Sequence, residues 1–383
     1  MKHLLCPPLS LYLHIPWCVR KCPYCDFNSH TAPDNLPVTE YVDALIRDLK
    51  FVAATVTGRT VKTIFIGGGT PSLLPEAELA RLLEHVGKHL QLDTNCEITL
   101  EANPGTLEAG RFAGFRAAGV NRLSIGVQSF NDRHLKVLGR IHDANAAYAA
   151  YASAVQAGLR RINLDLMFGL PEQTSAEALQ DLRTAIDLQP AHISWYQLTI
   201  EPNTVFYSKP PVLPPDDDLW DMQQQGRALM RRHGYRQYEV SAYARAGERC
   251  RHNLNYWRFG DYLGLGAGAH GKLTDIEHGR ITRTARHRLP AAYMQHAGTS
   301  KAVVVQRVLA DTDRSFEFML NALRLNDGAT LKQFEQRTGL SAQTIQTTCA
   351  SLQAKGLLKQ QTQRLCTTAT GARFLNDVVS AFL

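Results

Sequence analysis

The sequence predicts an α/β fold in which a mainly parallel sheet, open or curled into a barrel, is followed by a smaller helical module. Three observations favour this class. Six short apolar segments have the character of strands, and segments with helical periodicity alternate with them. The third observation is a short internal repeat: residues 118–123 (AGVNRL) are similar to residues 157–162 (AGLRRI). In both copies a glycine that can end a helix leads directly into a strand.

The strands are expected at residues 9–15, 63–66, 97–100, 122–127, 161–167 and 192–198. In the first of them, leucine or isoleucine at every second position alternates with Ser10, Tyr12 and His14, which is the pattern of a strand with one apolar face. Ligands of parallel α/β sheets bind at the carboxyl ends of the strands. Candidate site residues are therefore expected at those ends.

Helices are expected between the strands. The first covers residues 39–54 with Thr39 as its cap, and the second opens at Pro75. The third begins at Thr106 and stops at Gly119. A capping box, Thr174 with Glu177, begins the helix that precedes the sixth strand.

After residue 202 the pattern changes. Four prolines between 210 and 215 break the chain, a helix follows over residues 216–233, and residues 235–271 are rich in tyrosine, arginine and glycine. Gly266, Gly268 and Gly271 fit a dinucleotide-binding spacing, but no clear strand precedes them and no helix follows, which indicates a tight loop.

The C-terminal region is predicted to be a winged-helix-like module. It is expected to contain a helix from residue 315, a helix after Gly339, a helix to Lys355, a short strand pair within 357–368 and a last helix. The predicted division is a barrel domain at 1–205, a basic and aromatic extension at 206–305, and this module at 306–383. Residues 300–383 carry ten Lys and Arg against six Asp and Glu, a weak charge for DNA, so no nucleic-acid partner is expected.

The composition and the cysteine content argue against a membrane-spanning, a secreted or a disulfide-bonded protein. The 383 residues carry a formal charge of +7, are 44% apolar, and contain no run approaching the roughly 18 apolar residues of a membrane span. No signal-peptide core is recognisable at the N-terminus, so a cytoplasmic protein is expected. Thiols in that compartment stay reduced, so the eight cysteines are not expected to form disulfides.

Three cysteines lie within eight residues, directly after the first strand: Cys18, Cys22 and Cys25. Three thiolates at these spacings can bind three corners of a [4Fe–4S] cluster and leave one iron without a protein ligand. Zinc prefers four ligands, and no fourth Cys or His lies near on the loop. A redox pair of Cys22 and Cys25 is the other alternative.

This loop resembles that of the radical S-adenosylmethionine (SAM) superfamily, and Gly67-Gly68-Gly69-Thr70-Pro71 resembles its glycine-rich segment. The resemblance implies a partial (β/α)6 barrel in which SAM chelates the open iron and the reduced cluster cleaves it to a 5′-deoxyadenosyl radical. Further positions resemble one branch, oxygen-independent coproporphyrinogen III oxidase and its relatives. The SAM contacts that this implies are Tyr12, Tyr24, Gly68, Gly69, Thr70, Glu101, Gln128, Arg140 and Asp165.

Within that branch the sequence differs from the oxidase, which has a fourth cysteine where Phe27 stands here. Cys25-Asp26-Phe27 and the motif HNLNYW at 252–257 are similar to the HemW-type heme chaperones. That resemblance implies heme binding by His252, Tyr256 and Trp257. Residues 227–258 hold eight arginines and two acids, a surplus that suits the propionates of heme, although a solvated basic face would have the same composition.

The function expected is therefore a heme chaperone that binds a [4Fe–4S] cluster, SAM and heme and passes heme to an acceptor protein. Radical decarboxylation of coproporphyrinogen III is the first alternative. A heme- or redox-responsive regulator acting on DNA is the second, and the weak charge of the C-terminal region disfavours it. Peripheral association with a membrane is compatible with this function. The sequence does not name the acceptor or fix the oligomeric state.

Overall fold

A computed structural model describes residues 4–383, except for the side chains of residues 106–109. At its centre six parallel strands lie in the order in which the chain forms them. They are β1 (Leu9–Ile15), β4 (Thr60–Gly68), β5 (Gln91–Ala102), β6 (Arg122–Gln128), β7 (Arg161–Phe168) and β8 (His192–Gln197). All six expected strands are confirmed.

Further strands extend this sheet at both edges to twelve. Beside β1, the strand β11 (Asp261–Leu265) is parallel, and β12 (His270–Asp275), β13 (Arg280–Arg286) and β14 (Val303–Val308) continue antiparallel. Beside β8 lie β10 (Ala242–Ala244) and β9 (Arg236–Glu239). The two edges, β14 and β9, do not pair. The sheet is curved but open, as a partial barrel requires, and β2 (Trp17–Cys18) pairs separately with β3 (His30–Thr31).

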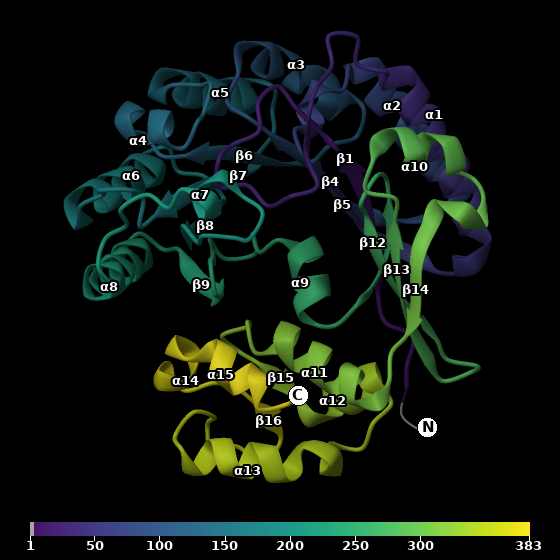
Figure 1. Cartoon of the computed structure of the whole chain (residues 1–383), viewed down its shortest axis with the longest axis vertical. Coiled ribbons are helices and arrows are strands. Elements are labelled where there is room, and N and C mark those ends of the chain that lie inside the picture. Colours follow the sequence, from purple (N-terminus) through teal and green to yellow (C-terminus); the bar gives the residue numbers. More distant parts are fainter. Residues whose placement is uncertain (1–3) are drawn as a thin grey trace.

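Helices cover the outer side of the curved sheet (Figure 1). They are α1 (Val38–Ala53), α2 (Glu76–His89), α3 (Thr106–Ala117), α5 (Ala144–Gln156), α6 (Ser175–Asp187) and α8 (Asp216–Arg232), with α10 (Pro290–His296) beside α1. Short helices α4 (Asp132–Val137) and α7 (Val205–Ser208) lie in the loops, and α9 (Arg251–Trp257) contacts β1 and β4.

The alternation of side chains along the strands creates two different faces. Leu11, Leu13 and Ile64 are buried in the apolar core that the sheet shares with the outer helices. The opposite face carries polar side chains such as Ser10 and Thr63, whose hydroxyls are 2.7 Å apart. Successive residues of a strand point to opposite sides of the sheet. The apolar residues therefore face the outer helices and form the core, and the residues between them face the concave side of the sheet.

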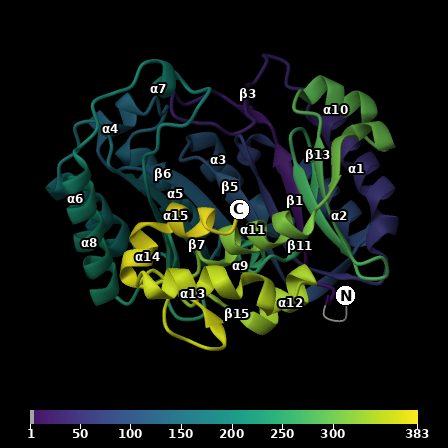
Figure 2. The same ribbon diagram turned by 60° about the horizontal axis from the view of Figure 1, so that its bottom comes forward.

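The C-terminal region forms a second, smaller core. It comprises α11 (Asp311–Ala322), α12 (Leu331–Thr338), α13 (Gln346–Ala354), α14 (Ala369–Arg373), α15 (Leu375–Ser380), β15 (Ala329–Thr330) and β16 (Arg364–Leu365). Phe318 and Phe334 pack together there, and Phe259 and Ile281 join this core from the sheet domain. Figure 2 shows the module in front of the inner side of the sheet. Among residues 4–383, no helix is both long enough and apolar enough to cross a bilayer.

Two local expectations are wrong. Helix α1 begins at Val38 after Pro37, and Thr39 does not cap it but donates its hydroxyl to Glu78 at 3.0 Å. Gly339 ends α12 in the left-handed conformation (φ 76°), and the helix expected after it begins as a 3-10 turn, Ala342–Ile345, that continues as α13. The expected strand pair at 357–368 is reduced to one bridge, because β16 pairs with the distant β15. The capping box of α6 is confirmed.

Candidate functional site

A cavity of about 430 Å³ lies at the carboxyl ends of the parallel strands. All three clustered cysteines line it, and so do eight of the nine residues expected to contact SAM. The exception is Tyr12, which lines a neighbouring cavity. Residues far apart in sequence are brought together here: Cys18, Cys22, Cys25, Tyr24, Gly68, Gly69, Thr70, Glu101, Gln128, Arg140 and Asp165.

The cysteine loop offers its thiols to this cavity at intermediate exposure. Burial raises the pKa of Cys18 and of Cys25, and Arg140 approaches the Cys22 sulfur at 3.6 Å. In the described part of the chain, no three His, Cys, Asp or Glu side chains converge closely enough to hold a single metal ion. Three thiols placed around one cavity beside a guanidinium fit a larger anionic group, and a cluster bound there would hold them as thiolates.

The glycine segment brings backbone to the wall of the cavity. A Cβ on Gly69 would lie 2.5 Å from the carbonyl oxygen of Trp17, and Gly68 has φ 121°, which disfavours any other residue. The Gly68 amide donates to the Glu101 carboxylate at 3.1 Å. The glycines thus allow the end of β4 to pack against the cysteine loop, and the Gly68 amide holds the Glu101 side chain next to them.

Two carboxyl groups give the cavity affinity for positive charge. Burial, with Asp165 nearby, raises the pKa of Glu101 to about 8. Burial also raises the pKa of Asp165, which accepts from Ser124 at 2.9 Å and from Asn163 at 2.8 Å. A ligand with a positively charged group, such as an amino or sulfonium cation, would restore the solvation that these carboxylates lose.

Arg140 and Gln128 are held in unusual environments. Arg140 donates to Asn103 at 2.5 Å and to the Gly126 carbonyl at 2.8 Å, while its Nε is buried without a protein partner. Gln128 has φ 69°, and its carboxamide accepts from Tyr196 at 2.7 Å. A non-glycine residue in the left-handed region costs conformational energy, which is typical of residues that a site constrains.

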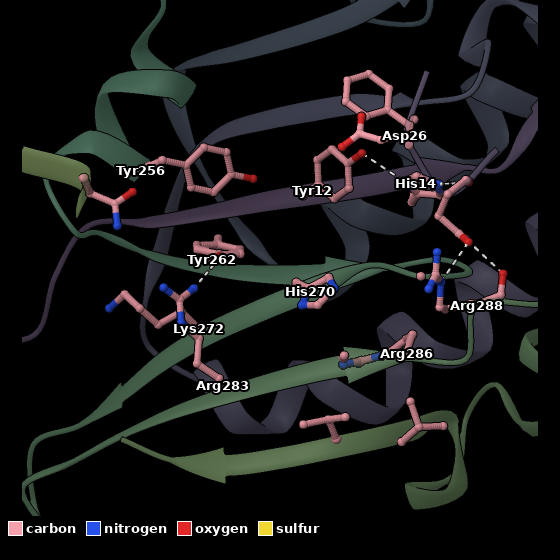
Figure 3. A pocket seen from close by; sticks show the side chains of 18 of the residues that line it. Tyr12, His14, Asp26, Tyr256, Tyr262, His270, Lys272, Arg283, Arg286 and Arg288 are labelled. Atoms are coloured by element: carbon pink, nitrogen blue, oxygen red, sulfur yellow. Dashed lines mark hydrogen bonds between the residues drawn. The ribbon is translucent and has the colours of Figure 1, made fainter. Parts of the chain in front are cut away.

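A second cavity of about 700 Å³ adjoins the first (Figure 3). Asp26, Phe27, Gly68 and Glu101 line both cavities. The rings of Tyr12, Tyr256, Trp257, Phe259 and Tyr262 and the cationic side chains of Lys272, Arg283, Arg286 and Arg288 line the larger one. An aromatic and basic cavity of this size suits a large flat anion.

The placement of His252 differs from its expected role. The side chain is fully buried: its Nδ1 lies 2.8 Å from the Thr63 hydroxyl and its Nε2 lies 2.9 Å from the Tyr256 hydroxyl. Burial, with Arg122 nearby, lowers its pKa to about 3. Both ring nitrogens are thus engaged, and His252 lies behind Tyr256 instead of in the cavity wall, so no nitrogen is available to an iron.

The arginines of residues 227–258 also lie elsewhere. None of them lines the larger cavity in the described structure. Arg245 lies over the Tyr235 ring and Arg249 over the Tyr238 ring. The cations of the cavity come from β12 and β13 and the loop after them, so the charge surplus read from the sequence does not mark the basic wall.

Comparison with known proteins agrees with this geometry. Residues 12–185 match the family model of the radical SAM superfamily, and residues 309–374 match that of the HemN C-terminal domain. The chain is 53% identical to heme chaperone HemW of Escherichia coli (strain K12) over 98% of both chains, and 35% identical to heme chaperone HemW of Bacillus subtilis (strain 168) over 98% of this chain and 99% of that one.

The chain belongs to the HemW family. Among solved structures, coproporphyrinogen III oxidase (HemN) from E. coli, described as a radical SAM enzyme, matches with a TM-score of 0.83 at 25% identity, over 98% of this chain and 90% of that one. Membership of the radical SAM superfamily implies a [4Fe–4S] cluster and SAM. The cysteine-lined cavity of this HemW-family chain fits both.

Several residues of the site escaped the sequence analysis. Asn103 links Arg140 to Thr70, to which it donates at 2.9 Å. Its position, directly after a strand, was a usable signal. Strand β11 was also missed, although it precedes the glycine loop at 266–271, and with it the histidine His270 at the start of β12. Only the pairing of these strands with β1 and with one another brings them to the cavity.

Proposed function

We propose that this chain is a heme chaperone of the radical SAM type, which holds heme in the larger cavity and passes it to an acceptor protein. The observation that carries the proposal is the pair of adjoining cavities, one with three thiols and buried carboxyls, the other aromatic and basic. Relatives of nearly equal length that are named heme chaperones support it.

In the smaller cavity, Cys18, Cys22 and Cys25 would hold the cluster. When bound, the cluster and SAM together supply a one-electron reductant and a radical precursor. The residues that would bind SAM are Tyr24, Gly68, Gly69, Thr70, Glu101, Gln128, Arg140 and Asp165, with Tyr12 at the junction of the two cavities. Glu101 and Asp165 would accept its positive charge, and Arg140 its carboxylate.

In the larger cavity, Tyr256 and Trp257 would lie against the porphyrin. His252 would act as a positioning residue, because its imidazole fixes the hydroxyl of Tyr256. We divide the chain into a segment 1–205 that would bind the cluster and SAM, a segment 206–305 that supplies most of the lining of the larger cavity, and a C-terminal module 306–383. We further propose a cytoplasmic location with at most peripheral contact to a membrane.

The competing function is oxidative decarboxylation of coproporphyrinogen III, which the likeness to the oxidase structure favours. Against it stands Phe27, 59% exposed at the junction of the cavities, where the oxidase has a fourth cysteine. A phenylalanine cannot supply the thiol at this position.

The test is made under anaerobic conditions with cluster-loaded protein. Hemin should co-elute with the protein on gel filtration and move to an acceptor apoprotein, and coproporphyrinogen III incubated with SAM and reductant should yield no protoporphyrinogen by chromatography. Efficient formation of protoporphyrinogen, or failure to retain hemin, would overturn the proposal.

A further inference from the structure

The glycine loop between β11 and β12 contributes no residue to the smaller cavity, and it ends at the larger one. Gly266 and Gly268 adopt φ 108° and 78°, and a Cβ on Gly264 would lie 1.8 Å from the carbonyl oxygen of His270. These glycines allow β12 to start in direct contact with β11. The backbone of His270 is fixed further by its pairing with Ala285 of β13. The loop therefore holds one histidine at a defined place in the cavity wall.

His270 differs from the other histidines near the cavity. His14 is engaged at both ring nitrogens, by the Tyr12 hydroxyl at 2.9 Å and by the Asn28 carbonyl at 2.9 Å, and His252 is engaged at both as described above. The imidazole of His270 has no hydrogen-bond partner among the described residues, and it is exposed to the cavity that it lines. Figure 3 shows it between Tyr262 on one side and Arg286 and Arg288 on the other, across from Tyr12.

We propose that His270, and not His252, is the protein ligand of the heme iron, a statement that rests on the proposed heme-chaperone function. A neutral imidazole with a free nitrogen is a common axial ligand of heme iron. Burial, with Arg283 and Arg288 nearby, lowers the pKa of His270, so the imidazole is neutral near pH 7. Tyr12, Tyr256 and Tyr262 line the same cavity as His270 and offer flat rings to a porphyrin.

The same wall contains a cation suited to a propionate. Lys272 is paired with Asp261 at 2.8 Å, Arg286 with Asp48 at 3.1 Å, and Arg283 with Glu317. Arg288 makes no ion pair within residues 4–383, and among these residues its guanidinium donates one hydrogen bond, to the Asn28 carboxamide oxygen at 3.5 Å. A heme carboxylate that reaches Arg288 would meet a cation without an acidic partner, whereas each of the other three already has a carboxylate partner.

The experiment titrates hemin into the full chain and records the Soret band and the affinity. His270→Ala should shift the Soret band and lower the affinity about tenfold or more, as expected when a metal ligand is lost, and added imidazole should restore the wild-type spectrum. His252→Ala, which frees the Tyr256 hydroxyl but removes no iron ligand, should weaken hemin binding and leave the Soret position unchanged. His278→Ala, an exposed histidine in the turn after β12, is the matched control and should change neither quantity.

A second arm tests the propionate contact. Arg288→Gln should weaken hemin binding without moving the Soret band, and it should have no effect on binding of the hemin dimethyl ester, which lacks the carboxylates. Cluster assembly by each variant verifies that it has folded, since the three cysteines line only the smaller of the two cavities.

The outcomes separate the two proposals. If wild-type protein does not retain hemin, the proposed function and this inference both fail. If wild type binds and releases hemin but His270→Ala gives the same Soret band, the chaperone function stands and the ligand assignment is overturned. A Soret shift in His252→Ala but not in His270→Ala would return the role to the HNLNYW motif.

Discussion

The buried carboxyl of Glu101 should make the ligand-free protein less stable as the pH rises. Its folded-state pKa is about 8 against an ordinary value of 4.5, because the cavity wall removes water from the group and Asp165 lies nearby. Between these two values the unfolded chain has released the proton while the folded chain retains it. The folded state therefore binds more protons, and the free energy of unfolding falls with rising pH through that window.

The size of the effect follows from the same two values. Each pH unit inside the window costs about 1.36 kcal/mol, so the full difference between 4.5 and 8 is about 5 kcal/mol. Glu101→Gln removes the titration but keeps an oxygen that can accept from the Gly68 amide. Relative to wild type, the variant should therefore gain about 3 kcal/mol between pH 5.5 and pH 8.5.

Urea denaturation of the cluster-free protein at several pH values measures this gain. Glu277→Gln, in the exposed turn between β12 and β13, is the matched control and should follow wild type at every pH, because Glu277 lines neither cavity. A difference between wild type and Glu101→Gln that stays constant with pH would refute the argument. SAM should narrow the difference at high pH, since its positive charge compensates the carboxylate.

Three further predictions concern the cluster, the glycine segment and the sheet. Alanine at any one of the three cluster thiols should abolish the brown absorbance of reconstituted protein and its EPR signal after reduction, whereas Cys96→Ala should keep both. Gly69→Ala, whose methyl would lie 2.5 Å from the Trp17 carbonyl, should lower SAM affinity in equilibrium dialysis at least about tenfold. Asp261→Asn leaves the buried Lys272 without its carboxylate and should lower the free energy of unfolding by about 3–5 kcal/mol. Glu84→Gln, which breaks an exposed pair with Lys88, should leave the melting temperature unchanged.

The smaller cavity could be predicted from the sequence because its residues follow a simple rule. Glu101, Gln128 and Asp165 each lie at or near the end of a parallel strand, and such ends meet at one edge of the sheet. Motif spacing placed the cysteine loop at the same edge. No long-range contact had to be known.

The larger cavity could not be predicted in this way. Its basic wall lies on β12 and β13, short antiparallel strands whose position depends on pairing across more than 250 residues, between β11 and β1. In the sequence, His252 and Tyr256 stand four residues apart in one motif, but only packing decides which of them faces the cavity. The hydroxyl of Thr63 in β4 hydrogen-bonds to the ring of His252 and so holds this histidine away from the cavity.

The parallel pairing of β1 with β11 has a consequence for biosynthesis. The cysteine loop leaves the ribosome early, yet it is tied down by residues that follow much later: the Asn28 amide donates to the carbonyls of Ala267 and Arg288, and Tyr41 bridges His14 to Ala267. At translation rates of 5–20 residues per second, the roughly 240 residues between Cys25 and Ala267 take about 10 to 50 s to appear. During that interval the thiols belong to an unfinished sheet and are open to oxidation. We therefore expect stable insertion of the iron–sulfur cluster only after Ala267 and Arg288 have been made, so that the cysteine loop, made early, is fixed late.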